Sequence, residues 1–266
     1  MRPEFHPAAF GYSVVAKRQT ALDRFSNQSA RVTMAAGTHM TNLYGMHPSA
    51  ALLDRFRSKP YQGQDPARAK IVVLGTDANY SSSISEHDFF GRILEYHEDG
   101  VAFWRKYRVH HPFLLPSYPF DRRRDGVRYH RNFQKMGLGP EFADQISFVE
   151  LLDVPTIGNT VQATFFKLLR PEHLHWLEEV LLSGGDEKLV LINQRLSRTV
   201  HLIHRRTGAL PALQRILVKG MNIGDSFAVG NATILNGYSF SHTVTDGYLL
   251  DLGARVREFR AGQALD

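Results

Sequence analysis

Four short apolar runs along the chain predict the strands of a sheet. They cover residues 70–74, 146–152, 188–192 and 232–235. Each run is rich in β-branched or aliphatic side chains, and polar or glycine-containing segments flank it. Runs that are apolar at nearly every position are typical of strands covered on both faces, as in parallel sheets.

Apolar residues at helical spacing lie between these runs. Phe89, Ile93, Leu94 and His97 fall on one helical face, and similar patterns over residues 173–182, 196–203 and 249–259 predict three more helices. Strands that alternate with helices predict an α/β fold. We expect a three-layer αβα arrangement around a central, mostly parallel four-stranded sheet.

The first 39 residues show no sustained period. Pro3 and Pro7 interrupt them, and residues 24–31 are mostly polar. We expect residues 1–39 to be a disordered or non-native N-terminal extension, with a mitochondrial presequence as the alternative. No linker rich in proline, glycine or serine divides the chain after residue 69, so we expect a single domain over residues 40–266.

The composition excludes several kinds of functional site. The sequence contains no cysteine, which excludes disulfides, thiolate zinc sites and a cysteine nucleophile. It also contains no run of 18 or more apolar residues, so we expect no membrane span. The expectation is a cytoplasmic monomer with no obligate protein partner and no cofactor.

The charge of the chain points to nucleic acid. The net charge is +6 and the isoelectric point is about 9.6. One basic cluster contributes Arg122, Arg123, Arg124, Arg128 and Arg131. Such a cluster favours DNA binding, because neutralising phosphates releases counterions. The alternative is a solvated basic loop.

Polar residues that follow the predicted strands are the candidates for chemistry, since ligands of such sheets bind at the carboxyl ends of the strands. Asp77 and Tyr80 follow the first strand, although Asp77 is also a plausible turn or N-cap residue. Glu150 interrupts the apolar second strand, and a buried carboxylate needs a partner or neutralisation. His242 lies in the loop after the fourth strand.

These three segments resemble the uracil-DNA glycosylase superfamily over roughly residues 70–260. Gly75-Thr76-Asp77-Ala78-Asn79-Tyr80 is similar to the family motif Gly-Gln-Asp-Pro-Tyr, and Ser241-His242-Thr243 is similar to His-Pro-Ser. The chain departs from the pattern in three places. Ala78 replaces the proline, Glu150 stands where the family usually has a base-reading Asn, and the last motif keeps only its histidine.

The resemblance implies a DNA repair hydrolase that cleaves the N-glycosidic bond of a flipped, damaged or deaminated base. Asp77 would orient water, and His242 would stabilise the leaving base. The expected base-binding residues are Gly75, Tyr80, Phe90 and Glu150. The expected contacts to the nucleic-acid backbone are Arg122, Arg123, Arg124, Arg128, Arg131 and Ser241.

Other functions stay open at this point. An ionised Glu150 accepts hydrogen bonds and does not donate them, which suits a different or modified base that presents N–H groups. A protonated Glu150, with a pKa raised by burial, is the alternative, because it would imitate the Asn. The chain is alternatively a catalytically inactive DNA- or nucleotide-binding member of the fold, or an unrelated α/β hydrolase. A metal site is disfavoured, because pairs such as His110-His111 lack a recognised ligand spacing.

Overall fold

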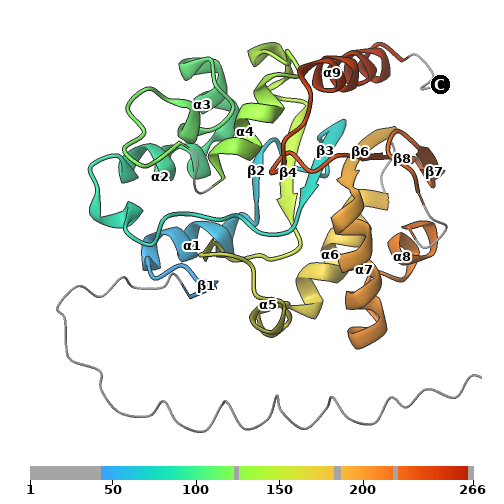
Figure 1. Cartoon of the computed structure of the whole chain (residues 1–266), viewed down its shortest axis with the longest axis horizontal. Helices are drawn as coiled ribbons and strands as arrows, with labels where there is room; N and C mark the ends of the chain where they lie inside the picture. Colours follow the sequence, from blue (N-terminus) through green and yellow to red (C-terminus); the bar gives the residue numbers. More distant parts are fainter. Residues whose placement is uncertain (1–42, 123–125, 183–186, 218–220, 263–266) are drawn as a thin grey trace, which may run out of the picture. The chain divides into compact units, whose positions relative to one another are not determined.

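The computed structural model describes residues 43–122, 126–182, 187–217 and 221–262 (Figure 1). The expectations for residues 1–39, for Arg123 and for Arg124 concern residues outside these ranges. The residues from Thr41 onward form one compact unit.

A sheet of six strands lies at the centre of this unit. Its order is β2 (Tyr61–Gly63), β4 (Ile146–Glu150), β3 (Ile71–Gly75), β6 (Lys188–Asn193), β8 (Ala232–Gly237) and β7 (Ser226–Val229). The four inner strands are parallel, and the two edge strands are antiparallel to their neighbours. A separate two-stranded sheet pairs β1 (Gly45–Met46) with β5 (Thr156–Ile157).

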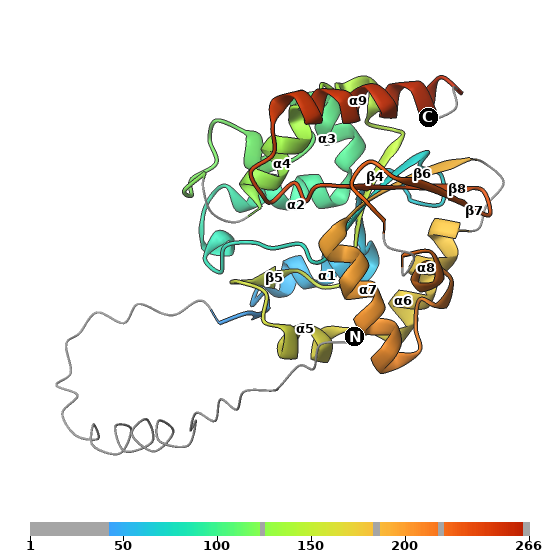
Figure 2. The same ribbon diagram turned by 45° about the vertical axis from the view of Figure 1, so that its right-hand side comes forward.

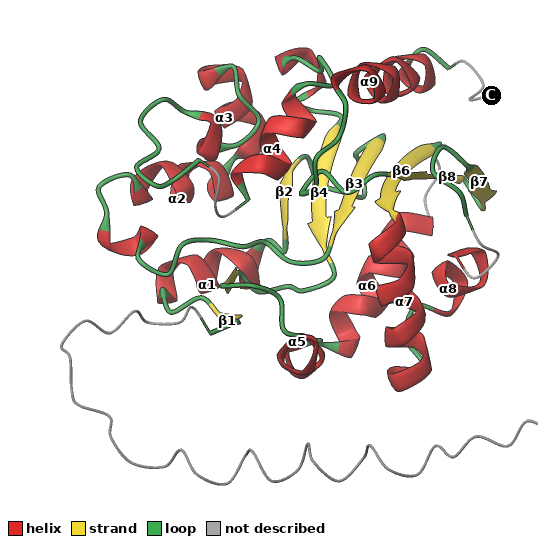
Figure 3. Ribbon diagram, in the orientation of Figure 1, coloured by secondary structure: helices red, strands yellow, loops and turns green. Residues whose placement is uncertain are grey.

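Alternation along the inner strands explains why their apolar runs are continuous. Val72 and Leu74 of β3 pack with α5 (Gln162–Leu168), α6 (Pro171–Leu182), α7 (Gln194–Thr207) and α8 (Pro211–Leu217). Ile71 and Val73 pack on the other face with α3 (Gly100–Tyr107), α4 (Val127–Gln134) and α9 (Asp246–Arg260). Successive side chains of a strand point to opposite faces, so both sets must be apolar. Figures 2 and 3 show α6 and α7 on one side of the sheet and α4 and α9 on the other.

A third apolar cluster lies beside the sheet. It joins α1 (Ala50–Ser58), α2 (Phe90–Glu98) and α3 to the short 3₁₀ helices η1 (Ile84–Glu86) and η2 (Pro112–Leu114). A further 3₁₀ helix, η3 (Pro140–Phe142), precedes β4. No helix among the described residues is long and apolar enough to cross a membrane.

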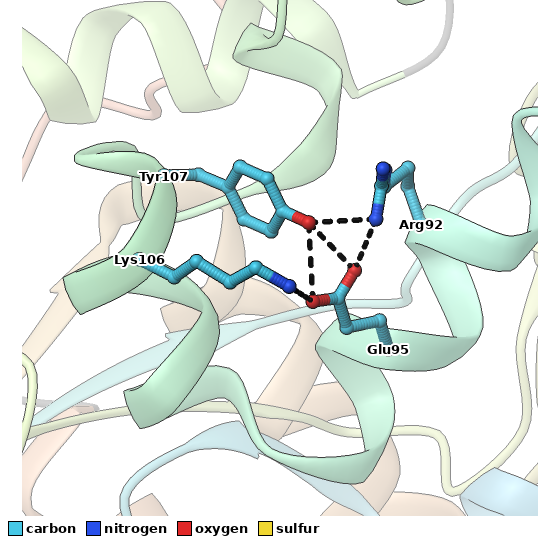
Figure 4. A network of polar contacts seen from close by, with 4 residues as sticks. All are labelled: Arg92, Glu95, Lys106 and Tyr107. Carbon is cyan, nitrogen blue, oxygen red and sulfur yellow. Dashed lines mark hydrogen bonds and ion pairs between the residues drawn. The ribbon is translucent and has the colours of Figure 1, made fainter.

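A polar network holds α2 against α3 at the surface of this cluster (Figure 4). Glu95 accepts hydrogen bonds from Lys106 (2.6 Å), Arg92 (2.8 Å) and the hydroxyl of Tyr107 (3.0 Å). Lys106 and then Arg92 lower the pKa of Glu95. Exposed pairs of this kind stabilise little individually, so the network mainly orients the two helices.

The structure confirms the α/β class and the mostly parallel sheet, and it corrects the number of strands from four to six. The two additional strands, β2 and β7, lie at the edges, where partial exposure weakens the apolar pattern. The second predicted run, 146–152, is also too long. Its strand ends at Glu150, so this carboxylate marks the end of a strand.

Candidate active-site cleft

A cleft of about 420 Å³ lies at the carboxyl ends of the parallel strands. The loop 75–80 after β3, Glu150 at the end of β4, and Ser239 and Ser241 after β8 form part of its walls. The remaining walls include residues of α4 and the segment that carries His111. This is the edge at which α/β sheets bind their ligands.

Two hydroxyl groups fix Asp77 in the cleft. Tyr44 and Thr156 donate hydrogen bonds to Asp77 Oδ2 over 2.9 and 2.7 Å. The backbone secures the same region, because Thr156 N–H donates to Ala78 O and Tyr80 N–H donates to Thr156 O. Oδ1 of Asp77 accepts no hydrogen bond from the described residues. That oxygen remains available to water or a ligand.

Burial raises the pKa of the Asp77 carboxyl above its ordinary value. The hydrogen bonds from Thr156 and Tyr44 oppose this rise, as does the charge of Arg195. Asp77 keeps some solvent-accessible surface in the cleft, but the protein atoms around it replace most of its hydration. The carboxylate is therefore more basic than one in water.

Glu150 is the second carboxyl group of the cleft. It lies opposite Gly75 in the parallel pair of β3 and β4, and a Cβ atom on Gly75 would overlap the Glu150 carboxylate. Burial, and next the negative charge of Asp77, raise the pKa of Glu150 well above its ordinary value. Its carboxylate accepts no hydrogen bond and forms no ion pair within the part of the chain that the structure describes.

Aromatic rings form much of the remaining wall. Tyr80, Phe113, Tyr129 and Phe148 line the cleft, and the Tyr80 hydroxyl is hydrogen-bonded to His97 Nε2 at 2.7 Å. Phe90 is half-buried in the apolar cluster around α2 and is not part of the wall. Flat apolar walls of this kind suit a planar ring ligand.

Two stacked histidines complete the wall, and sequence reasoning did not identify them. The rings of His111 and His130 lie parallel, with centroids 3.6 Å apart and an interplanar angle of 8°. His130 Nδ1 also shares a hydrogen bond with His110 Nε2 at 3.1 Å. Burial lowers the pKa of all three groups, so their rings are neutral at pH 7. In the sequence, His110-His111 suggested at most a metal site.

His242 does not join the two carboxylates. It lines a second hollow, of about 490 Å³, together with Arg122, Arg128 and Arg131. Asn132 of α4 explains this position, because its Nδ2 donates to Phe240 O (2.7 Å) and His242 O (2.9 Å). The loop after β8 is thereby held against α4. The expected convergence includes Asp77, Glu150 and Tyr80, but not His242.

The second hollow is a basic groove, and α4 separates it from the cleft. Tyr129 and His130 of this helix line the cleft, whereas its Arg128 and Arg131, together with Lys135 directly after the helix, line the groove. The guanidinium of Arg122 donates hydrogen bonds to Leu115 O and Pro116 O, and Lys135 forms an ion pair with Asp246. Ser241, expected beside the arginines, lines the cleft.

The fold and the cleft define a class: an α/β protein with two partly buried carboxyl groups at the carboxyl edge of a mostly parallel sheet. Within the described ranges, no group of three or more His, Asp or Glu side chains is arranged to hold a metal ion. Comparisons with protein families, with curated proteins and with solved structures found no match.

Proposed function

We propose that this protein is a DNA glycosylase that hydrolyses the N-glycosidic bond of a flipped base. The observation that carries the proposal is the pairing of Asp77 and Glu150 in one aromatic cleft, beside a groove that contains three arginines. We include the three-layer αβα arrangement in this proposal. The two carboxyl groups support the proposed function, because they stand at the ends of neighbouring strands, as the resemblance implies.

Asp77 acts on the attacking water in this mechanism. The C1′–N bond breaks and its electron pair leaves with the base, while the water oxygen forms the new bond to C1′ and Asp77 takes up its proton. Tyr44 and Thr156 hold Oδ2, which leaves Oδ1 for the water. A pKa raised by burial makes Asp77 a better general base, and its charge stabilises the cationic sugar.

The rings and Glu150 receive the base. An extruded base stacks between aromatic side chains and is read by hydrogen bonds to its edge. Phe113, Tyr129 and Phe148 supply such surfaces, and Glu150 supplies a carboxyl group that has no partner among the described residues. The cleft volume of about 420 Å³ lies within the range of about 300–1,000 Å³ that small-molecule sites occupy.

The basic groove takes the phosphodiester backbone. Arg128 and Arg131 line it, and no hydrogen bond or ion pair engages their side chains within the described part of the chain. Free guanidinium groups bind phosphate bidentately. The groove adjoins the cleft through α4, so a strand held there presents a neighbouring base to the carboxylates.

A second candidate is a protein of the same fold that binds DNA and does not cleave it. The position of His242 favours it, because the resemblance assigns stabilisation of the leaving base to this histidine and the cleft does not contain it. Without a donor at the base, departure of an anionic leaving group is slow.

Release of abasic sites separates these candidates. Oligonucleotides carrying uracil, hypoxanthine, xanthine or a mismatch are incubated with the protein, and abasic sites are revealed by alkaline cleavage. We expect turnover of at least one base, and a loss of ~10²-fold or more in Asp77→Asn, which removes the charge with little change in shape. The control is Asp54→Asn, because Asp54 is an exposed helix residue paired with Arg57.

The possible outcomes distinguish the glycosylase from the DNA-binding protein and from an unrelated hydrolase. Salt-sensitive DNA binding without cleavage of any base would support the binding protein. Neither binding nor cleavage would refute both candidates and favour a hydrolase with another substrate. Full activity of Asp77→Asn would refute the assigned mechanism.

A further inference from the structure

Three polar or aromatic side chains in the wall of the cleft share one face of the sheet. Gln62 of β2 lies directly opposite Phe148 of β4, so the two side chains point to the same face. Glu150 follows Phe148 by two residues on the same strand and therefore also lies on that face. All three line the cleft.

Gln62 is a buried residue whose amide has no partner among the residues that the structure describes. The residue is 5% exposed. Neither its Nε2 nor its Oε1 has a hydrogen-bond partner in those ranges. A buried amide that leaves its hydrogen bonds unmade destabilises the fold. An unpaired amide in the wall of a cleft is explained if a bound ligand forms the missing hydrogen bonds.

His111 is a fixed hydrogen-bond donor. Its Nδ1 accepts the backbone N–H of Phe113 at 3.2 Å, and a neutral imidazole that accepts at one nitrogen carries its proton on the other. The proton therefore lies on Nε2, which has no partner among the described residues. Stacking on His130 fixes the plane of the ring, and the residue is 3% exposed.

We propose that His111 and Gln62 are the specificity-determining residues of the cleft, where with Glu150 they bind the lactam edge of a base. A lactam edge presents a ring N–H beside a carbonyl oxygen. Glu150 accepts the ring N–H, and His111 donates to the carbonyl. The Gln62 Nε2 donates to the second lone pair of the same carbonyl oxygen. The inference rests on the proposed function, since it specifies which bases the cleft accepts.

The same arrangement gives His111 a part in the reaction. Negative charge accumulates on the carbonyl oxygens of a lactam as its ring nitrogen leaves. A neutral, preorganised N–H donor stabilises that charge without reorganisation. His111 thus occupies the role that the resemblance implied for His242, and it reaches the base from a different segment of the chain.

Binding of free bases tests the subsite without requiring turnover. The ligands are uracil, hypoxanthine, and their analogues methylated at the ring N–H, and the dissociation constants are measured by NMR titration of the full chain. We expect wild type to bind at least one parent base. Methylation of its ring N–H should weaken binding about tenfold or more, since it removes a hydrogen bond to a charged or buried partner.

Variants assign the contacts. His111→Phe keeps the ring and removes the donor, and Gln62→Leu keeps the volume and removes the amide, so each should weaken binding of the parent base about tenfold. His111→Gln restores a donor near Nε2 and should recover most of the loss. Gln64→Leu is the matched control, because Gln64 lies two residues from Gln62 and outside the cleft wall. Thermal melting verifies that each variant is folded.

The inference is overturned if wild type binds neither parent base at millimolar concentration. It is also overturned if neither methylation of the base nor His111→Phe and Gln62→Leu change the dissociation constant. Failure of the proposed function looks different. In that case free bases bind and respond to His111→Phe, while no oligonucleotide yields abasic sites. Conversely, cleavage that His111→Phe and Gln62→Leu leave intact would retain the glycosylase and reject this subsite.

Discussion

The position of Glu150 depends on the missing side chain of Gly75. The two residues are partners in the parallel ladder between β3 and β4, and the Glu150 carboxylate occupies the space that a Cβ atom on Gly75 would fill. Both residues line the cleft. The first glycine of the loop therefore determines where the second carboxyl group lies.

Gly75→Ala should displace Glu150 and reduce base binding and turnover. The added methyl group meets the carboxylate, so the side chain must turn away or the strands must separate. A double-mutant cycle with Glu150→Ala measures the effect. In that background the space is vacant, and Gly75→Ala should cost less free energy of unfolding than in wild type. Equal costs in both backgrounds would contradict the proposed overlap.

Glu150→Gln should stabilise the protein increasingly as the pH rises. The folded-state pKa of Glu150 is raised well above its ordinary value of 4.5. The wild type therefore loses free energy of unfolding as the pH rises from about 4.5 through the folded-state pKa, because ionisation is easier in the unfolded chain. Glutamine does not titrate. The melting temperature of the variant relative to wild type should increase between about pH 4 and pH 8, and a constant difference would disprove the shift.

The buried histidines should make the protein sensitive to acid. Burial lowers the pKa of His97 and of His110 to about 3, from an ordinary value of 6.5. Stability from these groups is complete above pH 6.5 and is lost as the pH falls, because the unfolded chain binds protons first. One such group contributes a slope of about 1.4 kcal/mol per pH unit.

His110→Phe should reduce that slope by the same amount over about pH 4–6, as measured by denaturant unfolding. The absolute stability will also change, because His130 loses its hydrogen-bond partner. The comparison of slopes is independent of that loss. An unchanged slope would show that His110 is not buried in its neutral form.

Tyr44→Phe should shift the pH dependence of turnover upward. The Tyr44 hydroxyl donates to Asp77 Oδ2 and lowers the pKa of Asp77, so its removal raises that pKa further. A base that must be ionised then reaches half its activity at a higher pH. Tyr61→Phe is the control, because Tyr61 lies on β2 outside the cleft wall. An unchanged pH profile would show that Tyr44 does not influence the ionisation of Asp77.

Neutralising Arg128 and Arg131 should weaken DNA binding alike for all sequences. The slope of log affinity against log salt should decrease by about one for each lost phosphate contact. Arg122 is unsuitable for this test, because its guanidinium supports the backbone of Leu115 and Pro116. The matched control is Arg68→Gln with Arg205→Gln, two exposed residues outside the groove. Equal slopes for both double variants would reject the groove as the backbone site.

The inner strands were predictable because both of their faces are buried. Val72 and Val73, for example, belong to apolar clusters on opposite faces of the sheet. Positions that point to either face of this strand are therefore apolar. The edge strands β2 and β7 have partly exposed positions, and no such continuous run marks them. The placement of Asp77 and Glu150 followed from strand order, since both lie at the ends of adjacent parallel strands.

The hydrogen-bond donors in the wall of the cleft left no signal in the sequence. His111 owes its tautomer to the backbone of Phe113 and its orientation to His130, which are tertiary relationships. Gln62 lies on an edge strand that the apolar pattern missed. The position of His242 depends on two hydrogen bonds from Asn132, a residue more than a hundred positions earlier. Sequence spacing contains no information on any of these contacts.

Helix α4 has a mechanical consequence for the whole site. Eight residues form a common partition between the cleft and the groove, and Asn132 ties that partition to the loop after β8. A rigid displacement or rotation of α4 alters the width of both hollows at once. Where the affinity of each hollow depends on the position of α4, a ligand bound in one hollow changes the affinity of the other, and by thermodynamic reciprocity the effect is equal in both directions.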